Sequence, residues 1–116
     1  MDGDRADRVF HALSDATRRD ILARAGTGEH SVSSLARHYP MSLTAVQKHV
    51  AVLERAELVT KRRHGREQLV TGRIDTLQGA RHVLDRFEEL WRDRLDRFGD
   101  VLADAMLPDS TKGDSR

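Results

Sequence analysis

The sequence predicts a mainly α-helical fold with one small β-hairpin, in the order four helices, two strands and one long helix. Apolar residues recur every three or four positions along most of the chain, N-capping residues precede these stretches, and the period changes after the fourth of them. The 116 residues suffice for one compact domain. We expect residues 1–107 to form this domain and residues 108–116 to be a disordered polar tail.

Capping residues and helix breakers divide the first part of the chain. The four expected helices cover about residues 4–13, 15–25, 31–39 and 43–56. Residues with short polar side chains are suited to cap the later three: Ser14 or Asp15, Ser31 and Ser42. Gly26 and Pro40 end the second and third helices, because glycine favours C-caps and proline cannot continue a helix. Residues 27–30 are expected to form a loop.

The apolar pattern changes after the fourth helix. We expect two strands over residues 58–63 and 67–71, joined by a tight turn at His64-Gly65. The last helix is expected from about Asp75 to Met106, because apolar residues there form one continuous stripe at steps of three and four.

The third and fourth helices have the features of a helix-turn-helix motif. An apolar stripe of Val46, Val50 and Leu53 leaves a polar face on the fourth helix, whose N-terminal residues would reach base edges in the major groove. The candidate base-reading residues are Ser42, Thr44, Ala45, Gln47 and Lys48. Glutamine pairs with adenine, lysine donates to guanine or phosphate, and alanine packs on a thymine methyl. For any one of these residues taken alone, the alternative is that it lies on a solvated helix face and has no role in DNA binding.

Charge is unevenly distributed although the net charge is only +1. Residues 42–73 carry seven basic and three acidic side chains, whereas residues 74–107 carry five basic and eight acidic ones. A basic hairpin beside a polar helix favours a polyanionic partner. The candidate phosphate or minor-groove contacts in the hairpin are Lys61, Arg62, Arg63 and Arg66.

Two segments resemble the ArsR-type winged helix-turn-helix repressors. The stretch FHALSDATRRDIL from Phe10 is similar to the family signature ALSDPTRRxIL, and the segment ending MSLTAVQKHVAVLERAELV at Val59 is similar to its recognition segment. Thr44, Gln47 and Glu57 replace a frequent proline, serine and glycine, so the operator sequence does not carry over from relatives. His49 stands where the family usually has histidine, and either contacts phosphate or packs against the neighbouring helix.

The resemblance implies a homodimer built from the first and last helices, which would bind double-stranded operator DNA with half-sites about 10 bp apart. Four of the five aromatic residues lie in these two helices, and the long stripe has more surface than one core can cover. The expected interface residues are Phe10, Leu84, Phe87, Trp91, Leu95, Phe98 and Leu102. An intramolecular core is the alternative.

Many ArsR-type proteins sense metals, and the best-known site is a cysteine pair in the third helix. This chain has no cysteine and carries Ser33 and Ser34 there. A second type of site uses Asp and His on the last helix, where His82 and Asp85 give only two candidate ligands per chain. We therefore expect no metal or cofactor and an unknown effector, with a metal-responsive repressor using a His/carboxylate site as an alternative.

We accordingly expect a sequence-specific transcriptional regulator of the cysteine-free subgroup, which the resemblance implies is an autorepressor. No nucleophile–base pair, HExxH or phosphate loop is present, so we expect no enzyme. The chain lacks a secretory signal and a membrane-spanning apolar run, which favours a cytoplasmic protein without a membrane partner. The alternative is a winged-helix protein-interaction module without DNA binding.

Overall fold

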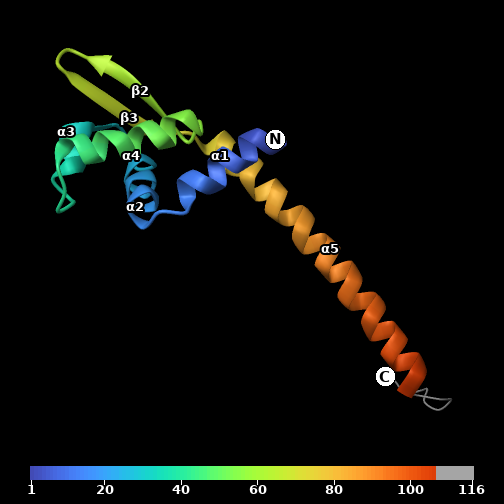
Figure 1. The fold of residues 1–116 in the computed structure, drawn as a ribbon. Helices are drawn as coiled ribbons and strands as arrows, with labels where there is room; N and C mark the ends of the chain where they lie inside the picture. The colour runs from blue at the N-terminus through green and yellow to red at the C-terminus, as the bar shows by residue number, and fades with distance from the viewer. Residues whose placement is uncertain (107–116) are drawn as a thin grey trace. The chain divides into compact units, whose positions relative to one another are not determined.

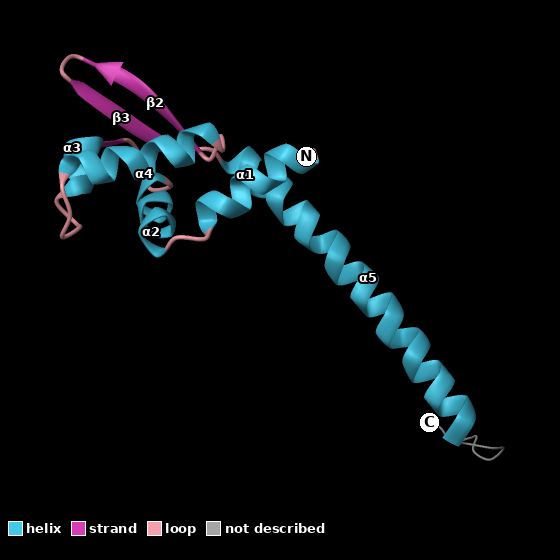
Figure 2. Cartoon of the chain, viewed as in Figure 1, coloured by secondary structure: helices cyan, strands magenta, loops and turns pink. Residues whose placement is uncertain are grey.

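A computed structural model describes residues 1–106 of the chain, so the expected polar tail at 108–116 lies outside the described residues. The chain divides into two compact units, Met1–Val83 and Leu84–Arg116. The elements in chain order are α1 (Gly3–Leu13), α2 (Ala16–Ala25), β1 (His30–Ser31), α3 (Val32–Ala36), α4 (Leu43–Arg55), β2 (Val59–His64), β3 (Glu67–Gly72) and α5 (Ile74–Met106). Figure 1 labels these elements, and Figure 2 distinguishes the helices from the strands.

The first unit combines a helical layer with a small antiparallel sheet of order β1-β3-β2. Helix α4 contacts both β2 and α2, and it lies between the hairpin and α2 (Figure 1). The strand β1 consists of the last residue of the expected loop, His30, and the expected N-cap, Ser31. His30 pairs with Val70, and Ser31 pairs with Leu69. The sheet therefore has three strands, because β3 provides backbone partners that the local sequence does not reveal.

The hairpin turn lies one residue further along the chain than the sequence indicates. His64 pairs with Glu67, so the two central residues are Gly65 and Arg66 rather than His64 and Gly65. Gly65 has a φ of 64°, and a positive φ at the first central position matches the right-handed twist of the flanking strands. Arg66 therefore lies in the tip of the hairpin.

The third helix is shorter than expected and ends at Ala36 instead of near Tyr39. The N–H groups of residues 37, 38 and 39 each donate to the carbonyl three residues earlier, at 3.0–3.3 Å. This tighter turn replaces the helical pattern before Pro40. The Tyr39 hydroxyl donates to Asp20 Oδ2 at 2.6 Å, and burial followed by this bond raises the pKa of Tyr39 to about 12. The turn before α4 is thereby attached to α2.

N-cap residues begin the helices largely as expected. Asp15, rather than Ser14, caps α2 by accepting the Arg18 backbone N–H at 3.0 Å. Ser31 and Ser42 cap α3 and α4 in the same way, at 3.0 and 3.1 Å. Each side chain satisfies a backbone donor that has no partner within the helix.

The end of α4 is a Schellman motif with a glutamate in the left-handed position. The Leu58 N–H donates to Leu53 O at 3.0 Å, and the Glu57 N–H donates to Glu54 O at 2.9 Å. Glu57 has a φ of 61°, the value that glycine adopts without strain. Its carboxylate lies 3.4 Å from Arg5 and 3.5 Å from Arg73, and Thr76 Oγ1 donates to its carbonyl at 2.6 Å.

The core of the first unit is formed by side chains from the helices and the sheet together. The larger fully buried apolar residues are Val9, Ile21, Leu35, Val46, Val50, Leu53, Leu58, Val59 and Val70. Full burial of each contributes roughly 1.5–3 kcal/mol. The expected stripe of α4, formed by Val46, Val50 and Leu53, is confirmed by its complete burial, and this burial fixes which face of α4 is exposed.

Candidate nucleic-acid interface

The N-terminal half of α4 presents a row of exposed polar side chains. Thr44, Gln47 and Lys48 are exposed because the buried stripe faces the core, and the cap Ser42 is exposed at the helix start. Ala45 is half-buried, which leaves only part of its methyl surface available. These residues share the end of the helix whose backbone N–H groups carry the positive end of the helix dipole, which favours contact with an anion.

His49 differs from this row because it is directed toward α2. Its Nδ1 lies 3.4 Å from the Arg18 guanidinium and 3.9 Å from Asp15 Oδ2. The same guanidinium donates to Ala12 O at 2.8 Å and His11 O at 3.0 Å. Of the two readings of His49 from the sequence, these contacts favour packing against the neighbouring helix, where the side chain positions α4 on α2.

The cap residue Asp15 has a lowered pKa. The largest cause is the hydrogen bond from the Arg18 backbone N–H, and the nearby charges of His49 and Arg18 act in the same direction. The carboxylate form of Asp15 is therefore favoured in the folded chain. This charge lies at the N-terminus of α2, where the helix dipole also stabilises it.

The hairpin divides its basic side chains between two faces. Lys61 shares a face with the buried Val59, and its Nζ lies 3.4 Å from Glu54 Oε1 on α4. Arg62 points to the opposite face and donates to both Glu29 oxygens at 2.9 and 3.2 Å. Arg63 and Arg66 are exposed, and no ion pair found within residues 1–106 includes either of them.

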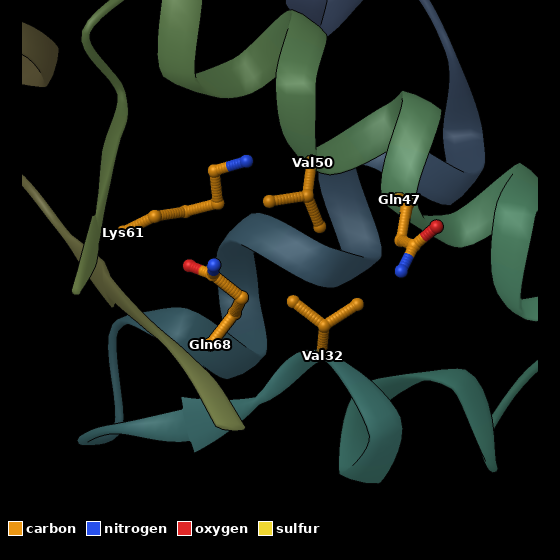
Figure 3. Close-up of a pocket in the computed structure, with 5 residues that line it drawn as sticks. All are labelled: Val32, Gln47, Val50, Lys61 and Gln68. Carbon is orange, nitrogen blue, oxygen red and sulfur yellow. The ribbon is translucent and has the colours of Figure 1, made fainter. Parts of the chain in front are cut away.

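A hollow of about 280 Å³ separates the exposed row of α4 from the hairpin (Figure 3). Val32 from α3 and Val50 from α4 face each other across its floor, and the polar ends of Gln47, Lys61 and Gln68 surround it. The hollow is therefore apolar at its base and able to donate hydrogen bonds at its edge. Because α4 and the hairpin both line this hollow, their exposed sides form one concave surface.

Gln68 is a candidate contact that sequence reasoning missed. It pairs with Arg63 and lies two residues from the buried Val70, so its side chain shares the inner face of the sheet. Leu69 and Val70 are adjacent apolar residues, so the pattern along β3 does not by itself indicate which side of the strand faces inward. Glu29 was also missed, because its contact with Arg62 joins residues that are 33 positions apart.

The expected dimer residues are divided between the two units. Phe10 is half-buried against the core of Met1–Val83. The other six lie on α5 within the second unit: Leu84, Phe87, Trp91, Leu95, Phe98 and Leu102. Their side chains are between 41% and 68% exposed. This unit therefore presents an apolar face that its own helix cannot bury.

Within residues 1–106, no group of three or more His, Cys, Asp or Glu side chains is arranged to hold a metal ion. None of the helices described there is both long and apolar enough to cross a membrane.

Comparison with known proteins agrees with this geometry. A family model described as a helix-turn-helix domain matches residues 13–62. The HTH-type transcriptional regulator Rv2034 of Mycobacterium tuberculosis is 41% identical over 81 residues, covering 70% of this chain and 76% of that protein. An ArsR-like transcriptional regulator from Rhodococcus sp. RHA1 has a TM-score of 0.75 and 34% identity, covering 84% of this chain and 92% of that one. The chain belongs to the ArsR family of winged helix-turn-helix transcriptional regulators.

Further relatives of this ArsR-family chain carry more specific descriptions. The transcriptional repressor SdpR of Bacillus subtilis is 34% identical over 59 residues, covering 51% of this chain and 66% of that protein. The homodimeric winged helix-turn-helix DNA-binding domain of Mb0332 from Mycobacterium bovis has a TM-score of 0.59 and 26% identity, covering 96% of this chain and 89% of that one. The relatives described here are transcriptional regulators and not enzymes, which agrees with the expectation from the sequence.

Proposed function

We propose that this ArsR-family regulator is a cytoplasmic autorepressor that binds a pseudo-palindromic operator as a homodimer, with an effector that modulates its affinity. The observation that carries the proposal is the concave surface formed by the exposed row of α4 and the basic hairpin. The descriptions of SdpR as a repressor and of Mb0332 as homodimeric support repression and dimerisation.

The concave surface fits the way in which a winged helix approaches DNA. With α4 in the major groove, Gln47 reaches adenine, and Lys48 reaches guanine or a phosphate. The hairpin then lies along the adjacent backbone or minor groove, where Arg63 and Arg66 contact phosphate without first leaving an ion pair found in the described chain.

The sugar-phosphate backbone of the DNA that separates these two grooves would pass over the hollow between α4 and β3. Gln68 and Lys61 lie beside that path, so Gln68 joins the candidate phosphate contacts. Lys61 and Arg62 are held by Glu54 and Glu29 in the free chain. Binding through either residue therefore exchanges a carboxylate for a phosphate, and we expect a smaller gain in affinity from these two than from Arg63 and Arg66.

The experiment is a gel-shift titration with the region upstream of the protein's own gene, repeated at several salt concentrations. Arg63→Ala or Arg66→Ala should weaken binding to every duplex and reduce the salt slope by about one, because each removes one phosphate contact. Arg92→Ala is the matched control, since it removes the same charge from α5 and should leave the slope unchanged.

Gln47→Ala tests base reading in the same assay. It should lose roughly 1–3 kcal/mol of discrimination at one base position and leave binding to unrelated duplexes unchanged. Equal weakening on all sequences would contradict a base-reading role. If the unmodified chain shifts no duplex at low salt, the protein-interaction module becomes the better function.

A further inference from the structure

A small hollow between α1 and α4 is surrounded by basic side chains. Its volume is about 80 Å³, and it is lined by Arg8 and His11 from α1 and by Val52, Arg55 and Ala56 from α4. Val52 is half-buried and Ala56 is buried, whereas the three basic residues are exposed. The hollow therefore has an apolar base, with two guanidinium groups and an imidazole at its edge.

The two guanidinium groups at this hollow are available to an anion. No ion pair found within residues 1–106 includes Arg8 or Arg55. The two acidic residues that precede Arg8 within α1 form no such pair either, and Glu54 Oε1 lies 3.4 Å from Lys61 Nζ on the hairpin. Because arginine stays protonated in proteins, the hollow carries two permanent positive charges.

Helix ends do not account for this cluster of basic residues. His11 and Arg55 lie in the last turns of α1 and α4, where the helix dipole favours a cation. Arg8 lies in the middle of α1 and gains nothing from a helix end, yet it lines the same hollow. The carbonyls of residues 52–54 already accept backbone N–H groups, so they do not require the Arg55 guanidinium.

The size and the donors of the hollow suit one small oxyanion. Pockets for drug-sized ligands are typically roughly 300–1,000 Å³, several times larger than this one. The planar fork of an arginine matches the oxygens of a phosphate, and an imidazole supplies an N–H donor whether it is charged or neutral. Two guanidinium groups and an imidazole that converge from two helices therefore favour a group with several acceptor oxygens, such as phosphate.

The hollow also continues the exposed row of α4. Arg55 follows Thr44 by eleven residues, which is three helical turns plus about 20°, so the two side chains lie on the same side of the helix about 16 Å apart along its axis. Lys48 lies between them on that side. An anionic surface that follows the row toward the end of α4 thus arrives at the hollow.

We propose that the hollow between α1 and α4 binds one phosphate group, held by Arg8, Arg55 and His11. The group is supplied either by the backbone of the operator or by a free phosphorylated small molecule that acts as the effector. The first source rests on the proposed function and is favoured by the alignment of Arg55 with the exposed row. Binding of a free phosphate group does not depend on DNA.

A titration of the full-length, 15N-labelled protein with inorganic phosphate tests the site itself, with sodium chloride of equal ionic strength as the reference. Backbone amide signals of residues 8–12 and 52–56 should shift saturably with phosphate. Arg55→Ala should raise the apparent dissociation constant at least fivefold, and Arg55→Lys should raise it less because it keeps the charge. Arg92→Ala is the matched control and should leave it unchanged.

The gel-shift titration at several salt concentrations distinguishes the two sources. If operator DNA supplies the phosphate, Arg8→Ala and Arg55→Ala should each reduce the salt slope by about one, whereas Arg92→Ala should not. If a free molecule supplies it, all three variants should keep the slope of the original chain. Far-UV circular dichroism verifies that each variant is folded.

Saturable shifts with reduced slopes, or reduced slopes alone, support the operator as the source, and saturable shifts with unchanged slopes support a free phosphate ester. The proposal is overturned if phosphate causes no saturable shift at residues 8–12 and 52–56 and the slopes of Arg8→Ala and Arg55→Ala equal that of Arg92→Ala. If the original chain shifts no duplex, the proposed function fails, and the phosphate titration alone decides whether the hollow is a site.

Discussion

Glu57 occupies a position in the α4–β2 connection where its own backbone conformation is unfavourable. Its φ of 61° places a β-carbon in the left-handed region, which glycine tolerates and most other residues do not. Three contacts hold the residue there: two arginines at its carboxylate and Thr76 at its carbonyl. Since both arginine pairs are partly exposed, we expect them to offset only part of the strain.

A pair of substitutions at this residue separates strain from charge. Glu57→Gly and Glu57→Ala remove the same carboxylate, but only glycine relieves the left-handed strain. We expect the Gly variant to be more stable than the Ala variant by about 1 kcal/mol. Urea denaturation of both variants measures the difference, and equal midpoints would show that Glu57 is unstrained.

The sequence predicted the candidate site unevenly. The exposed row of α4, including Gln47 and Lys48, follows from helical period alone because the buried stripe fixes the opposite face. The inward orientation of Gln68 could not be predicted from the sequence, because a shift of one residue in register reverses which side of a strand faces inward. The sequence left open whether His49 contacts DNA phosphate or packs against the neighbouring helix. The choice depends on the position of Arg18, which is 31 residues away in the sequence.

Elements in this chain begin where short polar side chains cap them. Asp15, Ser31 and Ser42 each bond a backbone N–H three residues later, and these contacts are local enough for sequence to predict. The strand β1 has only two residues and therefore no periodicity of its own. It is a strand only because β3 lies beside it, and the local sequence around residues 30 and 31 does not indicate that partner.

The cap of α2 makes stability depend on pH in a defined direction. The folded-state pKa of Asp15 is lowered from 3.8, so its contribution is complete above the unfolded-state pKa and is lost as pH falls through the folded-state pKa. Asp15→Asn keeps a capping side chain without a titrating group.

We therefore expect the melting temperature of the Asn variant to decrease less than that of the original chain when the pH is lowered from 6 to 3. Asp20 and Asp75 also have lowered pKa values and contribute to the pH dependence that remains. Thermal melts followed by circular dichroism over this range test the difference, and parallel curves would exclude a role for the Asp15 charge.

At the scale of the whole molecule, the two units differ in what they bury. All of the buried apolar residues of the described chain belong to Met1–Val83, whereas the large apolar side chains of the second unit are exposed. The first unit thus contains a complete core and the surface that we propose reads DNA. The second unit contributes the face that we assign to the partner.

Truncation after Val83 tests this division. We expect residues 1–83 to unfold cooperatively, because the core is intact, and to sediment as a monomer. Binding to a two-half-site operator should weaken roughly 10²-fold or more, because the two half-sites are no longer engaged by linked domains. Non-cooperative unfolding would show that α5 stabilises the core, and an unchanged dimer would place the interface elsewhere.

The strand order β1-β3-β2 also determines when the winged domain is able to fold during synthesis. The central strand is the last to be made, so neither outer strand has a backbone partner until the ribosome has passed Gly72. A nascent chain that ends within β2 contains all of α4 but lacks the middle strand of the sheet, so the concave surface between α4 and the hairpin is complete only after β3 emerges.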